Sequence, residues 1–235
     1  MDLPFEQFAA LSAVEICRHA FTRRIPGIDV SHDKSETLRQ LEHAHREIRN
    51  AIGIGDWPLI TVEQIHGNEL AIIDAKLMLH MQHKLGSGIR SEQAKHFAGC
   101  DGIITNQRGV ALGIYVADCC AVYIVDAKTP AIGLVHSGRK GTELGVVSGA
   151  ITQMIERFGS NPANMTVQLS PCIRPPHYEV DFAAEIVQQC RALGMEQIHD
   201  SGICTACNLE RYYSYRAEKG RTGRMLALLG LNPKL

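Results

Sequence analysis

The sequence predicts a single α/β domain over residues 1–235, and three observations support this fold class. Apolar runs of strand length recur along the chain, and segments with apolar residues at helical spacing separate some of them. The runs between residues 109 and 141 are apolar throughout, which is typical of strands buried on both faces. No linker, repeat or low-complexity tract divides the chain. We therefore expect one core whose sheet presents its polar residues at an edge, where α/β proteins bind ligands.

The expected elements alternate along the chain. Apolar runs predict strands at residues 13–22, 59–65, 70–74, 102–105, 110–116, 131–135, 165–169 and 225–231. Helical periodicity predicts helices at residues 35–52, 142–158, 182–193 and 209–218, and residues 76–97 predict a helix followed by a loop. His43 and His45 are two residues apart on the first long helix, so they do not share a face and are expected to be solvated.

The composition excludes several classes of protein. The chain has 235 residues and a formal net charge of -1, whereas nucleic-acid-binding proteins usually carry a basic excess, so no nucleic-acid partner is expected. No apolar run approaches the roughly 20 residues that a membrane helix needs, so no membrane partner is expected either. The N-terminus lacks the basic segment of a signal peptide. The eight cysteines are therefore interpreted as reduced thiols of a cytoplasmic protein.

Three predicted strands end close to a residue that can bind a metal or act as a nucleophile. His66, Cys119 and His136 hold these positions, and two imidazoles with one thiolate form a three-ligand set for zinc. Two alternatives stay open at this point. Cys119 beside a histidine is also a competent nucleophile without metal, or the three residues are ordinary core side chains. Cys120 is expected to point to the opposite face of an extended chain.

Other residues are candidates for supporting roles. Asp118 and Asp101 lie at predicted strand ends, where a carboxylate can orient a ligand or transfer a proton. Loop cations would form an anion pocket if their loops converge, and they are Arg24, Arg139, Lys140 and Arg174. The Cys-x-x-Cys at 204–207 lacks two further ligands at a comparable spacing, so its cysteines are interpreted as incidental thiols.

Six segments together carry a resemblance to a known family. They are EQIHG (63–67), CDGIIT (100–105), GVALGIYVADC (109–119), AIGLVHSGRKG (131–141), SPCIRPPHYEV (170–180) and SYRAEKGRTGR (214–224). In this order they resemble the laccase-domain proteins, once called multicopper polyphenol oxidases. That family is now understood as purine nucleoside phosphorylases with adenosine deaminase and methylthioadenosine phosphorylase activity. The resemblance implies a cytoplasmic, single-domain, mixed-sheet α/β sandwich with its site at strand ends.

The resemblance also implies roles for particular residues. It makes His66, Cys119 and His136 the metal ligands, usually for zinc, and it places the family arginine at Arg24. The implied substrates are a purine nucleoside and phosphate. Cys119, Asp118 and Arg24 are then the expected catalytic residues, with Asp118 moving protons. The cations expected to hold phosphate are Arg24, Lys140 and Arg174.

The chain departs from the family pattern in the loops on the substrate side. Arg139 and Lys140 stand where Trp-Arg is usual, Arg174 stands where glycine is usual, and the Gly-rich loop is largely missing from residues 25–35. Two alternatives to the nucleoside enzyme therefore stay open. One is a copper-dependent polyphenol oxidase, as the older family name implies. The other is a non-catalytic protein that keeps the metal site as a relic.

Overall fold

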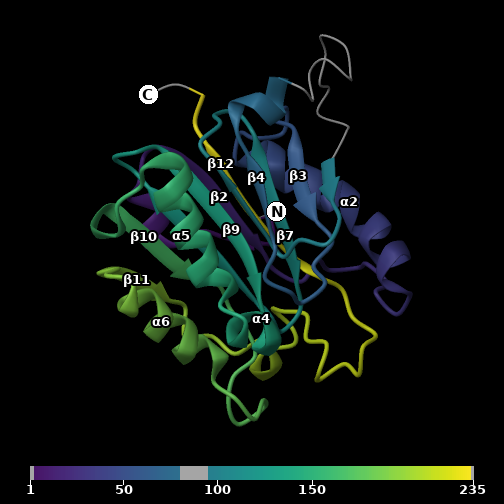
Figure 1. Cartoon of the computed structure of the whole chain (residues 1–235). Coiled ribbons are helices and arrows are strands. Elements are labelled where there is room, and N and C mark those ends of the chain that lie inside the picture. Colours follow the sequence, from purple (N-terminus) through teal and green to yellow (C-terminus); the bar gives the residue numbers. More distant parts are fainter. Residues whose placement is uncertain (1–2, 80–94, 234–235) are drawn as a thin grey trace.

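The computed structural model describes residues 3–79 and 95–233, and two six-stranded sheets dominate it (Figure 1). The first sheet runs in the order β1 (Phe5–Glu6), β2 (Cys17–Thr22), β12 (Met225–Leu231), β7 (Ala111–Val116), β3 (Leu59–Val62) and β5 (Lys95–Phe97). The pairs β1–β2, β2–β12 and β12–β7 are antiparallel, whereas the pairs β7–β3 and β3–β5 are parallel. This sheet is therefore mixed.

The second sheet is mixed as well. Its order is β11 (Gln197–Asp200), β10 (Met165–Leu169), β8 (Cys120–Asp126), β9 (Ala131–Ser137), β6 (Gly102–Thr105) and β4 (Leu70–Ile73). The outer pairs β11–β10 and β6–β4 are parallel, and the pairs between them are antiparallel. Strands β8 and β9 lie at its centre and are buried along their whole length.

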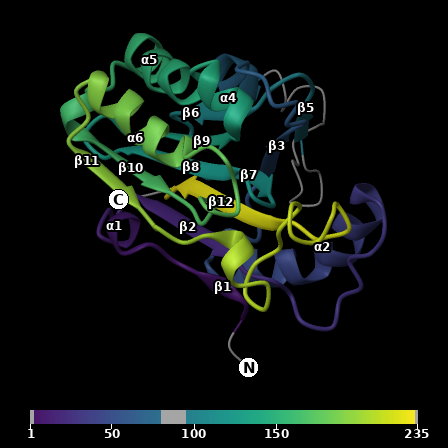
Figure 2. The same cartoon turned by 90° about the horizontal axis from the view of Figure 1, so that it is seen from below.

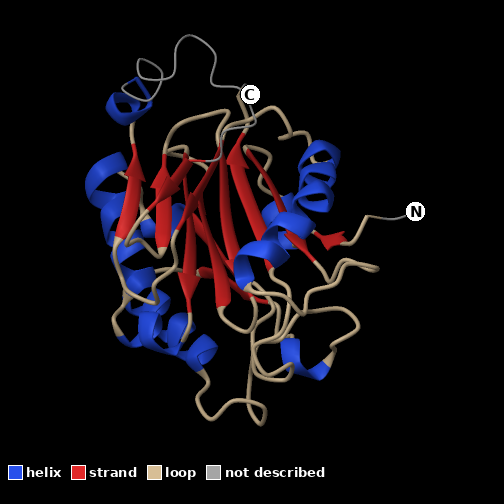
Figure 3. Cartoon of the chain, turned by 90° about the vertical axis from the view of Figure 1, so that its right-hand side faces the viewer, coloured by secondary structure: helices blue, strands red, loops and turns tan. Residues whose placement is uncertain are grey.

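The two sheets pack face to face, and helices cover their outer faces (Figures 2 and 3). Helices α5 (Val146–Phe158) and α6 (Phe182–Ala192) pack on the second sheet, whereas α2 (Lys34–Ala51) lies beside the first. The arrangement is an α/β sandwich with two mixed sheets, which confirms the fold class expected from the sequence.

Strand β8 shows how one apolar run serves two cores. Ala121, Tyr123 and Val125 point between the sheets, and the alternate residues Cys120, Val122 and Ile124 point toward α5 and α6. The Tyr123 hydroxyl donates a 2.8 Å hydrogen bond to the Ala20 carbonyl oxygen on β2, so it joins the two sheets. Cys120 is fully buried on the helix side, on the opposite face from Cys119, as predicted.

The first long helix agrees with its prediction to within one residue at either end. It begins after Asp33, whose side chain accepts a hydrogen bond from the Glu36 amide and so caps the helix. The expectation of a solvated His45 is wrong, since its side chain is buried. His45 lies one turn after the buried Leu41, and its ring packs against Tyr115 with 5.9 Å between centroids. His43 is exposed, as predicted.

Several predicted boundaries differ from the structure. The predicted helix at 142–158 is two helices, α4 (Arg139–Glu143) and α5, because the backbone turns left-handed at Gly145. The predicted strand at 13–22 begins only at Cys17, because α1 (Ala9–Ser12) and a turn precede it. The predicted helix at 209–218 is wrong, since this segment forms turns whose backbone groups bond to distant side chains.

The helix and loop predicted at residues 76–97 can be compared with the structure only in part. Residues 75–79 are helical, but most of the predicted helix and loop lies in residues 80–94, outside the described part of the chain. Two short 3₁₀ turns occur, η1 (Pro162–Asn164) and η2 (Thr205–Cys207). Within residues 3–79 and 95–233, every helix is too short or too polar to cross a membrane.

Candidate metal centre and substrate cavity

Three strand ends bring His66, Cys119 and His136 together, and we call this group the His66 centre. His66 follows β3, Cys119 follows the neighbouring β7, and His136 lies on β9 of the facing sheet. One donor atom from each residue lies within 4.8 Å of the other two. The Cys119 Sγ is 3.9 Å from His66 Nε2, and the two imidazole rings are 4.8 Å apart between centroids. The three residues predicted from the sequence therefore meet at one point.

The donor atoms of the His66 centre fit a metal ion. A tetrahedral zinc ion with ordinary bond lengths separates a sulfur from a nitrogen ligand by about 3.6 Å, close to the separation found here. Two imidazoles and a thiolate suit zinc or copper better than calcium or magnesium. Three protein ligands also leave a fourth position for water or substrate, as in catalytic zinc sites. The group can therefore hold a metal, whose identity the geometry leaves open.

The buried carboxylate of Asp101 holds both histidines in place. Its Oδ1 accepts hydrogen bonds from the His66 amide at 2.8 Å and from His136 Nδ1 at 2.9 Å. Its Oδ2 accepts a bond from the Gly67 amide at 2.7 Å. Because Nδ1 of His136 is engaged, Nε2 is the nitrogen left to bind a metal. The orienting role expected of a strand-end carboxylate is thus filled by Asp101.

Just before His66, where the backbone after β3 no longer pairs with β7, the side chain of Gln64 takes over this pairing. Both Gln64 and His66 have left-handed backbones, with φ of 64° and 63°, which is costly for residues other than glycine. The Gln64 amide side chain pairs with the backbone of Tyr115 on β7, accepting from its N–H at 2.9 Å and donating to its oxygen at 2.5 Å. This pairing lets the backbone leave the sheet and turn His66 toward Cys119.

Gly138 gives Cys119 the room it needs. A Cβ at this position would lie 2.7 Å from the Cys119 Sγ, which is closer than a real contact allows. The backbone of Gly138 has φ of -100°, so glycine is needed here for space and not for conformation. The junction between β9 and α4 can therefore pass directly beside the thiol only with glycine at 138.

The charges of the centre favour a thiolate. Burial raises the pKa of Cys119, but the adjacent His136 and His66 outweigh burial and lower the pKa to about 6. Burial lowers the pKa of His136, but Cys119 and Asp101 outweigh it and raise the pKa to about 9. Near neutral pH the metal-free protein thus holds a thiolate beside an imidazolium. A thiolate is the form that binds a metal, and a metal cation would displace the imidazolium proton.

The His66 centre lies in a cavity of about 970 Å³, a volume in the range of small-molecule sites. Aromatic and cationic side chains line most of the rest of the cavity, together with the two carboxylates Asp118 and Glu143. The aromatic ones are Tyr115, Tyr178, Phe182 and Tyr215. The cationic ones are Lys34, Arg139, Lys140, Arg216, Lys219 and Arg224. An anionic ligand with a flat ring would find complementary groups on these walls.

Three further predicted residues line this cavity, and Arg139 is one of them. Lys140 reaches it from the first turn of α4. Asp118 also lines it, but both of its carboxylate oxygens are already engaged. Oδ1 accepts a 2.7 Å hydrogen bond from the Thr205 hydroxyl, and Oδ2 accepts a 2.7 Å bond from the Arg216 amide. In this conformation Asp118 therefore anchors two neighbouring loops.

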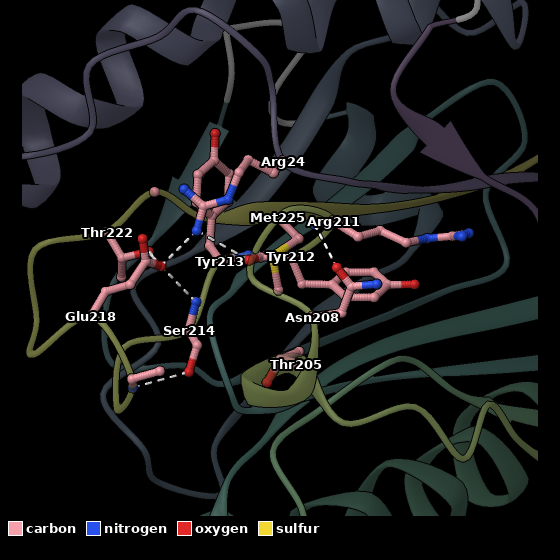
Figure 4. Close-up of polar contacts among 12 residues, drawn as sticks. Arg24, Thr205, Asn208, Arg211, Tyr212, Tyr213, Ser214, Glu218, Thr222 and Met225 are labelled. Carbon is pink, nitrogen blue, oxygen red and sulfur yellow. Dashed lines mark hydrogen bonds and ion pairs between the residues drawn. The ribbon is translucent and has the colours of Figure 1, made fainter. Parts of the chain in front are cut away.

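Arg24 and Arg174 are not among the residues that line the cavity. Figure 4 shows the Arg24 guanidinium beside Glu218, at 2.8 Å, and donating to the Tyr212 carbonyl oxygen. It also lies over the Tyr213 ring, 4.4 Å from the centroid. Arg174 forms an ion pair with Asp200. Of the three cations predicted to hold phosphate, only Lys140 therefore lines the cavity.

Sequence reasoning gave no role to Arg216, Arg224 or Tyr178 on the cavity walls. Arg216 and Arg224 lie in the SYRAEKGRTGR segment, and Tyr178 lies in SPCIRPPHYEV, both of which carried the family resemblance. These segments could have pointed to the walls, but only the fold shows that they face His66 and Cys119.

A second group of side chains that could hold a metal ion includes the Cys-x-x-Cys motif. Cys204 and Cys207 lie with His177 in a group whose donor atoms are all within 4.8 Å of one another. The third potential ligand is near in space but far in sequence, which is why spacing alone missed it.

Two packed mixed sheets with a His-Cys-His group at their strand ends define an α/β sandwich with a candidate metal centre. The chain belongs to the multi-copper polyphenol oxidoreductase laccase family, whose model matches residues 19–185 and 180–232. Curated relatives of this chain carry the name purine nucleoside phosphorylase. YlmD of Bacillus subtilis is 28% identical over 73% of this chain and 70% of its own length. A Corynebacterium glutamicum relative is 26% identical over 91% of this chain and 94% of its own.

Solved structures share the fold. The crystal structure of YlmD from Geobacillus stearothermophilus has a TM-score of 0.77 and 21% identity, covering 98% of this chain and all of that one. A Bacillus licheniformis protein, YfiH, has a TM-score of 0.74, 21% identity and coverage of 97% and 99%. At these identities the likeness shows the fold alone.

Proposed function

We propose that this protein is a zinc-dependent purine nucleoside phosphorylase that also deaminates adenosine and cleaves methylthioadenosine. One observation carries the proposal: a single cavity combines the His66 centre with aromatic and cationic walls. The names of the relatives support the same class of enzyme.

The cavity walls suggest how the two substrates would bind. Tyr178 and Phe182 pack edge to face, 5.9 Å apart between centroids, and present an apolar surface on which a purine can stack. Arg224 and Lys140 are the cations that we assign to phosphate. Arg216 is less available, because it pairs with Glu179 at 2.6 Å. Arg24 and Arg174 would need to leave their present ion pairs to contribute.

Phosphorolysis needs little covalent chemistry from the protein. A phosphate oxygen bonds to C1′ of the ribose while the bond from C1′ to the purine nitrogen breaks, and the base leaves with that electron pair and takes up a proton. Arg224 and Lys140 would orient the phosphate and offset its charge. A bound zinc ion would supply Lewis-acid stabilisation of developing negative charge. His66, Cys119 and His136 would hold the ion, and Asp118 is our candidate for proton transfer.

Two other functions compete with this proposal. A copper-dependent polyphenol oxidase matches the description of the family model, and the ligands of the His66 centre also suit copper. A non-catalytic protein would keep the metal while turning over nothing. The oxidase predicts oxidised phenols and the non-catalytic protein predicts no product, so product analysis separates all three.

The test is to incubate the purified protein with adenosine, inosine or methylthioadenosine, with and without phosphate, and to separate the products. The proposal predicts free base and sugar phosphate only when phosphate is present, and inosine from adenosine without it. Phenol oxidation that scales with copper loading would favour the oxidase. Failure to convert any nucleoside, by protein that carries its metal, would overturn the proposal.

A further inference from the structure

A second cluster of metal-binding side chains lies outside the substrate cavity. His177, Cys204 and Cys207, which we call the His177 cluster, are not among the residues that line it. Cys204 directly precedes the 3₁₀ turn η2 and Cys207 is its last residue, whereas His177 belongs to the loop between β10 and α6. Two segments distant in sequence thus converge on one point.

We propose that the His177 cluster is a second zinc site. The Nδ1 atom of His177 is 3.5 Å from the Cys207 Sγ and 3.8 Å from the Cys204 Sγ. Around a tetrahedral zinc ion, sulfur and nitrogen ligands are about 3.6 Å apart and two sulfur ligands about 3.8 Å apart. The two sulfur–nitrogen separations found here are close to the first of these values, and the two sulfur atoms lie within 4.8 Å of each other.

The chemistry of the donors selects the class of metal. Two thiolates and an imidazole favour zinc over the hard cations calcium and magnesium, which prefer oxygen ligands. The Cys-x-x-Cys spacing is also the one that structural zinc sites commonly use. Cys207 and His177 are exposed, so a water molecule or small anion can complete the coordination.

The position of the cluster indicates a structural role. The Thr205 amide donates to the Cys172 carbonyl oxygen at 3.1 Å, and the Thr205 hydroxyl donates to Asp118, next to Cys119. Residue 178, immediately after His177, is a tyrosine that lines the cavity. Zinc at the cluster would therefore connect two segments. One is the turn η2, whose Thr205 bonds to Asp118, and the other is the loop that carries Tyr178. It would hold one wall of the cavity without touching substrate.

The first test is the zinc content of matched variants after loading with zinc and desalting. The proposal predicts two equivalents in the wild-type protein and one in either Cys207→Ser or His177→Ala. It predicts one equivalent in Cys119→Ala, which affects only the His66 centre, and none in the Cys119→Ala/Cys207→Ser double variant. Cys100→Ser removes a partly exposed thiol outside both groups and should leave two.

Unchanged zinc content in both Cys207→Ser and His177→Ala would overturn the proposal. A wild-type protein with a single equivalent that Cys119→Ala abolishes would overturn it as well. Because the Cys207 and His177 readouts are independent of nucleoside turnover, the second site can fail while the proposed activity stands.

Thiol labelling of the wild-type protein tests the site without any variant. The proposal predicts that Cys204 and Cys207 resist alkylation in zinc-loaded protein and react after a chelator is added, as peptide mass spectrometry would show. Immediate alkylation would mean that no metal protects them. Alkylation only after a reductant would mean that the two cysteines form a disulfide. Either result would overturn the proposal.

Discussion

At the scale of single residues, one buried carboxylate organises the candidate metal centre. Asp101 accepts a hydrogen bond from the ring of His136 and two more from the backbone at His66 and Gly67. A histidine ligand with its second nitrogen held in this way keeps one tautomer and one orientation. The carboxylate thus orients His66 and His136, which come from two different sheets.

Asp101→Asn is expected to weaken zinc binding about 10- to 100-fold, the usual effect of removing such an orienting partner. The amide keeps the size of the side chain but cannot accept hydrogen bonds at both of its ends. Competition with a chromophoric chelator measures the affinity, and the exposed Asp56→Asn serves as a matched control. Unchanged affinity in Asp101→Asn would show that the histidines hold their orientation without it.

The thiol of Cys119 should titrate far below an ordinary cysteine in metal-free protein. With a pKa of about 6, the thiolate forms as the pH rises through 6, so the rate of alkylation should level off near neutral pH. Since His136 is the main opposing charge, His136→Ala should move the midpoint of the rate profile upward. A wild-type profile that still rises above pH 8 would contradict the charge arrangement described for the centre.

At the residue scale the candidate metal ligands could be predicted, whereas Arg224 and Tyr178 on the cavity walls could not. His66, Cys119 and His136 follow apolar strands whose ends are visible in the sequence, and the family resemblance picks the same three. Arg224 and Tyr178 sit in irregular segments, where no periodicity fixes direction. The burial of His45 was not predicted, because the position of this residue on the buried face of α2, and not its polarity, determines its exposure.

At the scale of elements, the centre depends on how strands end. Strand β3 stops at Val62, and the Gln64 side chain then takes over its pairing with β7. Strand β9 passes into α4 through Gly138, directly beside the Cys119 thiol. The sequence predicted the strands but not the break between α4 and α5, because apolar residues continue through it.

Gly138→Ala should damage the metal centre more than the fold. The added methyl group would meet the Cys119 Sγ at 2.7 Å, and relieving such a contact typically costs about 1–3 kcal/mol. We expect zinc affinity and nucleoside turnover to fall together. Gly149→Ala is the matched control, since a Cβ there has open space and alanine favours a helix. Full zinc affinity in Gly138→Ala would show that the thiol can move without consequence.

At the scale of the whole molecule, two mixed sheets form a rigid base for the site. His66 and Cys119 come from the first sheet, and His136 comes from the second. The interface between the sheets therefore sets the distances between these candidate metal ligands. The longer strands could be located from the sequence, whereas β1, β5 and β11 were missed, and β5 lies in the predicted loop of residues 76–97. The family resemblance implied the sandwich. Strand order was not predictable, because pairing between distant strands leaves no local pattern.

Tyr123→Phe tests the connection between the sheets. It removes the buried hydrogen bond to the Ala20 carbonyl oxygen and should lower the free energy of unfolding by about 1 kcal/mol. For a chain of this length that loss lowers the unfolding midpoint by roughly 2–4 °C. Zinc content should be unchanged, because the aromatic ring still fills the core. Thermal unfolding measures the effect, and a midpoint equal to wild type would show that the bond contributes nothing.

The central claim is that His66, Cys119 and His136 hold a metal ion on which nucleoside turnover depends. The most direct measurement determines metal content and phosphate-dependent base release in the same preparations of wild type and Cys119→Ala. The variant is expected to lose one metal equivalent and its turnover together. Normal turnover by a Cys119→Ala protein that has lost this metal would contradict it.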